Sequence, residues 1–311
     1  MSGNANGNGT TNGTHPGFTT TSGGIDHELP PMSLYRKALK LGVWDPRDID
    51  LSRDSADWAR LSPDEQDYLQ VLLAQFVAGE EAVTLDLLPL IHAIASEGRF
   101  EEELYLTTFL FEEGKHAVFF RRFMDEVIGG PVDWRRYHTP AYAKMFYEDL
   151  PRTMNRLLTD KSREAQALAS TTYNMFVEGV LAETGYFSFY SALDARKILP
   201  GLREGVRLIQ RDESRHIGYG VYLLSRLANE DPRIYDVIER RMNELLPCVG
   251  ALLAETYSRY QSMPFGLDLE VTNEFARSRF QSRMARIARA KEEDFARQSV
   301  ESFEAEAAVP L

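Results

Sequence analysis

This sequence of 311 residues has a single cysteine, no long apolar run and no excess of basic residues. Cys248 is the only cysteine, so no internal disulfide can form, and we expect a packing residue in a reducing cytoplasm. No apolar stretch approaches membrane-spanning length, and the first residues lack the pattern of a secretory signal. The net charge of −12 argues against binding nucleic acid or an anionic membrane surface.

Alternating, strand-like patterns are also scarce, whereas amphipathic helical periods run through most of the chain. Residues 1–25 contain almost no apolar side chains, so burial there cannot offset the loss of chain entropy. The composition predicts a disordered low-complexity tail over residues 1–25, an all-helical domain over residues 26–298 and a flexible carboxyl-terminal tail over residues 299–311.

Turn and capping residues divide the helical domain. Ser62, Pro63 and Glu65 predict a helix start with a capping box, and Pro89 is expected to kink that helix. A second helix is expected from about 100 to 128, before Gly129-Gly130. The remaining helices are expected over about 139–158, from 162 onward, from 200 to about 228, over about 232–261 and over 272–297.

A repeated Glu-x-x-His pattern, Glu113 with His116 and Glu213 with His216, is the most informative feature. Residues three apart on a helix share a face, so each carboxylate and imidazole can bind one ion together. A four-helix bundle that holds two metal ions needs two such pairs and one glutamate from each of two other helices. The expected ligands, in chain order, are Glu80, Glu113, His116, Glu178, Glu213 and His216.

Each expected glutamate lies one turn from strongly apolar residues, where an unpaired ionised carboxylate is costly. Two divalent cations would balance the four negative charges, with two neutral imidazoles completing the ligand set. Oxygen-rich ligands with one imidazole per ion suit iron and manganese, with zinc as an alternative. The adjacent glutamates Glu80–Glu81 and Glu112–Glu113 leave open whether one of each pair faces water.

These residues resemble the small-subunit superfamily of ribonucleotide reductases. The similarity runs from about Trp44 through His216 and more loosely to about residue 295, and it is strongest in residues 111–116 and 211–216. It implies a ferritin-like four-helix-bundle core with additional helices, a dinuclear metal site inside the bundle, and a homodimer. By this match Asp212 would orient His116, and Trp44 resembles the family's electron-relay tryptophan, with a packing aromatic as the alternative.

Two departures argue against a radical-generating reductase subunit. The family's radical tyrosine lies four residues after the first histidine ligand, where this chain has Phe120. The reductase subunits also use a tyrosine near the carboxyl terminus, whereas no tyrosine follows Tyr260 here.

Residues 75–84 and 173–178 are similar to a narrower group, the R-two-like (R2-like) ligand-binding oxidases. The resemblance implies one manganese and one iron ion, dioxygen as oxidant, and a long-chain fatty acid whose carboxylate reaches the metals. It also implies an ether cross-link between Val83 and Tyr173, residues that apolar periodicity alone would assign to the core. Beyond Glu178, one to two turns along the helix, Ala182, Gly185 and Tyr186 are candidate pocket residues, with tight helix packing as the alternative.

The sequence therefore predicts a dioxygen-dependent oxidase with a dinuclear metal centre. One alternative is a tyrosine-free reductase small subunit, which Phe120 permits but the missing terminal tyrosine opposes. Another is a ferritin-like protein that binds metal without catalysis. All three share one scaffold, so the fold cannot choose among them. No sequence feature identifies the physiological substrate, the electron donor, or which metal occupies which position.

Overall fold

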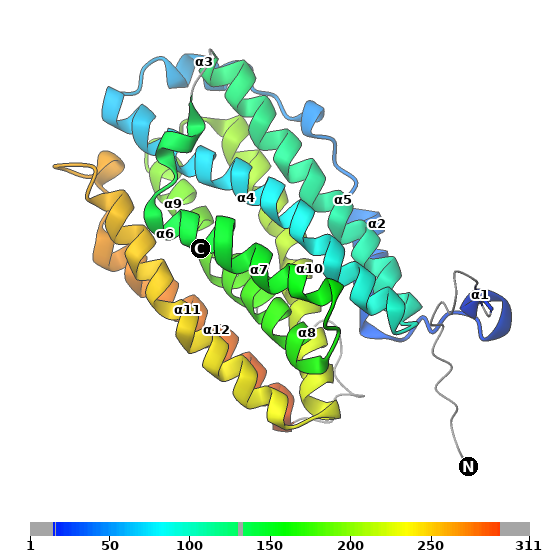
Figure 1. Cartoon of the computed structure of the whole chain (residues 1–311). Coiled ribbons are helices and arrows are strands. Elements are labelled where there is room, and N and C mark those ends of the chain that lie inside the picture. The colour runs from blue at the N-terminus through cyan, green and yellow to red at the C-terminus, as the bar shows by residue number, and fades with distance from the viewer. Residues whose placement is uncertain (1–14, 16, 130–132, 293–311) are drawn as a thin grey trace.

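The computed structural model describes residues 15, 17–129 and 133–292, and these residues form helices and no strands. This confirms the predicted all-helical fold. The bundle consists of α4, α5, a long composite helix and α10, with further helices on either side (Figure 1). These elements are α4 (Pro63–Ser96), α5 (Phe100–Phe123), the composite helix α8 (Arg163–Ser170), η6 (Thr171–Ala182) and α9 (Glu183–Asp194), and α10 (Pro200–Glu230).

The predicted capping box begins α4. Ser62 Oγ accepts a hydrogen bond from the Glu65 backbone N–H, and the Glu65 carboxylate accepts one from the Ser62 N–H at 2.9 Å. The helix continues through Pro89 to Ser96, so this proline lies inside the helix and does not end it. The 34-residue helix α4 places Glu80 in the middle of the bundle. Residues of α4 before and after Glu80, such as Phe76 and Val83, line a cavity.

The composite helix begins where the sequence predicts. Ser162 caps its amino-terminal end, and its Oγ accepts a hydrogen bond from the Ala165 N–H. Its middle segment η6 is π-helical over 12 residues, which the sequence did not predict. In an α-helix, residues five apart point roughly 140° away from each other. In a π-helix the i→i+5 bond brings them onto neighbouring turns. Tyr173 and Glu178 are five apart and lie in this segment, so both can face the bundle interior.

The bundle is covered on two sides. On one side α2 (Pro30–Leu41) lies against α5 and α10, and α3 (Ser52–Trp58) against α10. On the other side α11 (Arg233–Tyr257) and α12 (Leu269–Glu292) pack against each other and against η6, as the yellow and orange helices in Figure 1 show. The shorter elements are α1 (Thr19–Ser22), η1 (Pro46–Asp48), η2 (Met124–Ile128), η3 (Trp134–Tyr137), α6 (Pro140–Ala143), η4 (Lys144–Asp149), α7 (Leu150–Asn155), η5 (Arg156–Leu158) and η7 (Pro264–Gly266).

Two large clusters of buried apolar side chains fill the bundle. One contains Phe109 and Tyr173, and the other contains Phe119, Phe120 and Phe189. Along α5 the buried residues between Phe109 and Phe119 are all polar: Glu112, Glu113, Lys115 and His116. The polar side chains of the predicted site are therefore flanked by apolar packing along this helix.

Of the expected amino-terminal tail, α1 falls within the described residues, whereas residues 1–14 and 16 lie outside them. The expected carboxyl-terminal tail also lies outside the described residues, so both tails stay predictions. No helix in the described part of the chain is both long enough and apolar enough to cross a membrane.

Candidate metal centre

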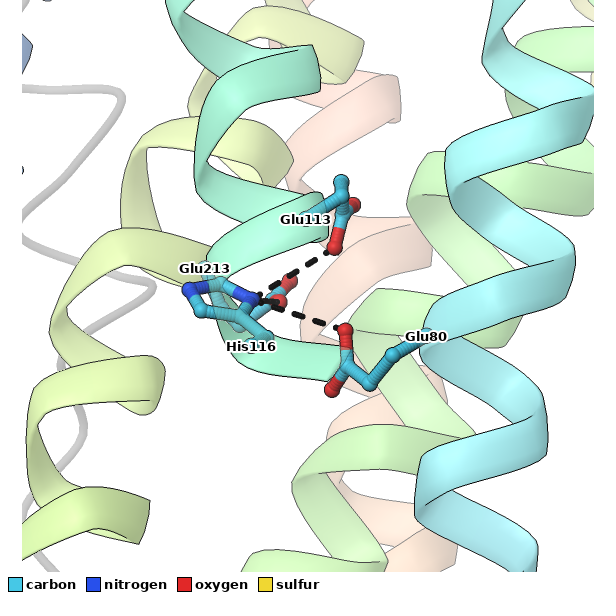
Figure 2. Close-up of side chains that lie close together, drawn as sticks. All are labelled: Glu80, Glu113, His116 and Glu213. Carbon is cyan, nitrogen blue, oxygen red and sulfur yellow. Dashed lines mark ion pairs between the residues drawn. The ribbon is translucent and has the colours of Figure 1, made fainter. Parts of the chain in front are cut away.

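The six predicted ligands converge in the middle of the bundle, from four different helical segments. Each of these residues is at most 5% exposed. Their ligand atoms form two groups, and within each group all atoms lie within 4.8 Å of one another. One group contains Glu80, Glu113, His116 and Glu213, which Figure 2 shows pointing toward one another, and the other contains Glu113, Glu178, Glu213 and His216.

Two glutamates belong to both groups. They are Glu113 and Glu213, and Glu213 lies between the two imidazoles. One oxygen of Glu213 lies 3.3 Å from His116 Nδ1, and its other oxygen lies 3.3 Å from His216 Nδ1. The arrangement thus offers two ligand sets that share two carboxylates.

The donor atoms fit a pair of cations, because several of them lack any other partner. Glu113 Oε2, Glu178 Oε1 and His116 Nδ1 are buried and have no hydrogen-bond partner among the described residues. Burial raises the pKa of Glu80 to about 8, although His116, whose Nδ1 lies 3.5 Å from Glu80 Oε2, acts in the opposite direction. Burial and the charge of Glu213 raise the pKa of Glu178 well above its ordinary value. Metal ions would satisfy these atoms and remove the cost of the converging negative charges.

Both imidazoles turn Nδ1 toward the centre and Nε2 away from it. The Nδ1 atom of His116 lies 3.5 Å from carboxylate oxygens of both Glu80 and Glu113. Burial alone would lower the pKa of each imidazole, but the surrounding carboxylates reverse this and raise it well above its ordinary value. Because a metal ligand must be deprotonated at the binding atom, loading the site with metal would release protons.

Asp212 contacts His116 as the resemblance implies. Its Oδ2 atom lies 3.3 Å from His116 Nε2 and also accepts hydrogen bonds from Trp44 Nε1 at 2.8 Å and from Lys115 Nζ at 2.7 Å. Trp44 also stacks on His116, with ring centroids 6.2 Å apart. Trp44 is therefore connected through Asp212 to His116, a ligand of the candidate centre. This contact is compatible with both the electron-relay and the packing role of Trp44.

Glu112 answers a question that the sequence left open. The sequence left open whether one glutamate of the pair Glu112–Glu113 faces water, but both are 1% exposed. Glu112 Oε2 lies 2.9 Å from His216 Nε2, and its Oε1 accepts a hydrogen bond from the buried Arg215. Glu112 thus holds His216 as Asp212 holds His116. Of the other adjacent pair, Glu80 is buried and Glu81 is exposed.

A repeated five-residue pattern could have revealed Glu112, Lys115 and Arg215. Residues 112–116 and 212–216 both read acid, glutamate, small residue, cation, histidine. The guanidinium of Arg215 bridges Glu112 and Asp212, with 2.7 Å from its Nη2 to Asp212 Oδ1. The carboxylates behind the two histidines are therefore connected by one buried cation.

Tyr173 lies against this centre. Its hydroxyl donates a hydrogen bond to Glu113 Oε1 at 2.7 Å, and burial together with the charge of Glu113 raises the pKa of Tyr173 well above its ordinary value. The next residue, Asn174, donates a hydrogen bond from Nδ2 to Oε2 of Glu178, one turn further along, at 3.0 Å, a positioning contact that the sequence analysis missed. Val83 is 5% exposed and belongs to the same apolar cluster as Tyr173.

A cavity of about 860 Å³, counted with its opening to solvent, adjoins the centre. The metal-facing glutamates and Val83 line one part of it, and α11 contributes apolar side chains such as Val249 and Leu253. The three predicted pocket residues, Ala182, Gly185 and Tyr186, all line it. Gly185 also packs tightly against Phe76 of α4, because a Cβ at Gly185 would lie 2.4 Å from the ring of Phe76.

Comparison with known proteins agrees with this geometry. Residues 28–290 match the family model of the ribonucleotide reductase small chain. An R2-like ligand-binding oxidase with an aerobically reconstituted Mn/Fe cofactor is 41% identical, with a TM-score of 0.85 over 88% of this chain and 98% of that chain. A valine-to-alanine variant of such an oxidase, with an anaerobically reconstituted Mn/Fe cofactor, is 41% identical over the same shares, with a TM-score of 0.83. The chain therefore belongs to the ribonucleotide reductase small-chain family, in its group of R2-like ligand-binding oxidases.

Proposed function

We propose that the protein is an oxidase whose centre holds one manganese and one iron ion. Glu80, Glu113 and His116 would hold one ion, and Glu178, Glu213 and His216 the other. The observation that carries this proposal is the pair of ligand sets with buried donor atoms that lack other partners. The Mn/Fe cofactors of the structural relatives support the choice of metals.

The bound metal pair would supply two-electron oxidation driven by dioxygen. The chain's own residues supply geometry and proton transfer. The hydroxyl of Tyr173 already donates to Glu113 Oε1, so that carboxylate is placed to receive the phenolic proton. Val83 and Tyr173 belong to one apolar cluster beside the centre, where Tyr173 is fully buried and Val83 also lines the cavity.

The oxidation that we propose within the chain joins Tyr173 Oη to Val83 Cβ as an ether. The O–H bond of Tyr173 and the Cβ–H bond of Val83 break, one C–O bond forms, and dioxygen accepts the two electrons and two protons that leave the chain. The physiological substrate, if it is a different molecule, would be oxidised at the same centre.

We propose that the cavity holds a long-chain fatty acid. Its lining along α4 extends from Tyr68 to Val83, which corresponds to roughly 22 Å at the rise of an α-helix. Apolar side chains make up most of the lining, and the acidic end of the ligand would lie where Glu80 and Glu178 line the cavity. The four glutamates balance two divalent ions, so a further carboxylate is favoured once the metals carry more charge.

Intact mass spectrometry tests the cross-link. Wild-type protein loaded with manganese and iron in air is expected to lose two hydrogens relative to metal-free protein, and Tyr173→Phe is expected to abolish that loss. Tyr186→Phe is the matched control, because Tyr186 is a buried tyrosine that lines the adjoining cavity but is not the residue to be linked. An unchanged wild-type mass would refute the cross-link and leave the metal centre standing.

Metal analysis separates the remaining functions. An oxidase should stop at about two ions per chain, whereas a storage protein should take up many more. Nucleotide reduction on addition of a large reductase subunit would instead favour the tyrosine-free reductase. The homodimer and the cytoplasmic location stay predictions. Exposed apolar side chains on α4 and α5, such as Leu85, Leu88, Phe111 and Val118, are compatible with a dimer surface.

A further inference from the structure

The two imidazoles of the centre are each held from behind by a carboxylate, but the two carboxylates are not equivalent. From this difference we propose that Glu112 is a positioning residue that strengthens metal binding at the His216 position specifically. The inference deepens the proposed function and rests on it, because it concerns how the two metal positions differ. Neither the sequence nor the ligand set distinguishes them, since both positions offer glutamates and one histidine.

The carboxylate oxygen that faces His116 is shared. Asp212 Oδ2 accepts from Lys115 at 2.7 Å and from Trp44 at 2.8 Å, and it lies 3.3 Å from His116 Nε2. A cation and a second donor thus draw on the same oxygen as the imidazole. The negative charge that this oxygen offers to His116 is therefore partly neutralised.

The carboxylate oxygen that faces His216 is engaged differently. Glu112 Oε2 lies 2.9 Å from His216 Nε2, whereas the cation Arg215 binds the other oxygen, Oε1. When Nδ1 of His216 binds a metal, Nε2 carries the hydrogen and donates it to Glu112. A charged acceptor in that place makes the imidazole a stronger metal ligand and fixes its orientation. His216 therefore has the stronger and closer carboxylate partner of the two histidines.

A glycine from a distant segment leaves room for the Glu112 carboxylate. Gly42 ends α2, and a Cβ added there would lie 1.9 Å from Glu112 Oε1. The backbone of Gly42 has φ −84°, which alanine adopts without strain, so an alanine would act through contact with the carboxylate and its surroundings. The same Cβ would lie 2.9 Å from the Ala38 carbonyl oxygen, and the Gly42 carbonyl accepts a hydrogen bond from Lys115 Nζ at 2.6 Å, so Gly42→Ala would disturb both carboxylates and the variants of Glu112 and Asp212 themselves make the sharper test.

The test measures each metal position separately. Crystals of the full chain are equilibrated without oxygen at limiting Mn²⁺, and anomalous scattering gives the occupancy of the two positions. Glu112→Gln keeps the size of the side chain but removes its charge. We expect it to weaken binding at the His216 position by roughly 10- to 100-fold, with a much smaller change at the His116 position.

Asp212→Asn is the matched variant, and it should weaken the His116 position instead. A purely structural role for Glu112 would lower both positions together, so equal losses in Glu112→Gln, or no loss at the His216 position, would overturn the inference. Failure of the wild-type protein to take up metal at either position would instead overturn the proposed function, which keeps the two failures distinguishable.

Discussion

Two glycines inside helices are expected to respond to alanine substitution in opposite directions. Gly205 in α10 faces α5, and a Cβ there would lie 1.9 Å from Cζ of Phe119 and 2.3 Å from both Cε atoms. At Gly250 in α11, nothing lies within 4 Å of an added Cβ. Alanine gains roughly 1 kcal/mol over glycine inside a helix in either place. The two substitutions therefore share this gain and differ in packing.

The packing cost at Gly205 follows from the surroundings of Phe119. Carbon atoms pack at about 3.5–4.0 Å, so the Phe119 ring must retreat by roughly 1.5–2 Å. This ring is fully buried, 5.5 Å from the ring of Phe120 and 6.4 Å from that of Trp44. Overpacking of a core costs about 1–3 kcal/mol, and a shift this large belongs at the upper end. We expect Gly205→Ala to be about 2 kcal/mol less stable than wild type, and Gly250→Ala about 1 kcal/mol more stable.

Urea unfolding of the metal-free variants beside wild type measures both differences. Phe119→Leu in the Gly205→Ala background should recover part of the loss, because the smaller side chain leaves room for the new methyl group. The double-mutant cycle should then show a coupling on the order of 1 kcal/mol. Equal stability of Gly205→Ala and Gly250→Ala would refute the reasoning, since it would mean that the close approach of α10 to Phe119 costs nothing to disturb.

Two further predictions concern buried charges. Asp86 is 4% exposed and has no ion pair or hydrogen bond among the described residues, and burial raises its pKa from 3.8 to about 6. Because the folded pKa lies above the unfolded one, the ionised Asp86 destabilises the fold as the pH rises through this range. Asp86→Asn should therefore stabilise the protein by roughly 1–2 kcal/mol at pH 7 but not at pH 4. Equal effects at the two pH values would contradict this prediction. Arg215→Met should destabilise the metal-free protein by about 3–5 kcal/mol, because it leaves Glu112 and Asp212 buried without their shared cation. A loss below about 1 kcal/mol in urea unfolding would show that these carboxylates do not depend on Arg215.

Local signals in the sequence were enough to place the helices and the metal-facing residues. The capping box at Ser62 and the i,i+3 spacing of Glu113 and His116 are contacts within one helix, so they follow from sequence spacing alone. The π-helical turn of η6 is different. It brings Tyr173 and Glu178, five residues apart, toward one centre, and its hydrogen-bond pattern depends on the packing of the whole bundle.

The burial of Glu112 also depended on tertiary contacts. Neighbouring residues on a helix point roughly 100° apart, which favours one buried and one exposed side chain in a pair. That holds for Glu80 and Glu81, but Glu112 lies beneath the end of α2, where Gly42 leaves room for it. Its counterion Arg215 comes from a segment 103 residues away. No spacing rule within one helix predicts that contact. The repeat of residues 112–116 at 212–216 was the one sequence feature that could have indicated it.

The repeat also explains how the centre keeps its shape. The carboxylate of each half holds the histidine of the other: Asp212 of α10 contacts His116 of α5, and Glu112 of α5 contacts His216 of α10. Arg215 joins the two carboxylates, so the imidazoles cannot turn independently without breaking a buried charged contact. Such contacts are costly to bury and do not by themselves favour stability. Their effect is instead to hold both Nδ1 atoms toward the interior before any ion arrives, so that metal binding need not reorganise the helices that also line the cavity.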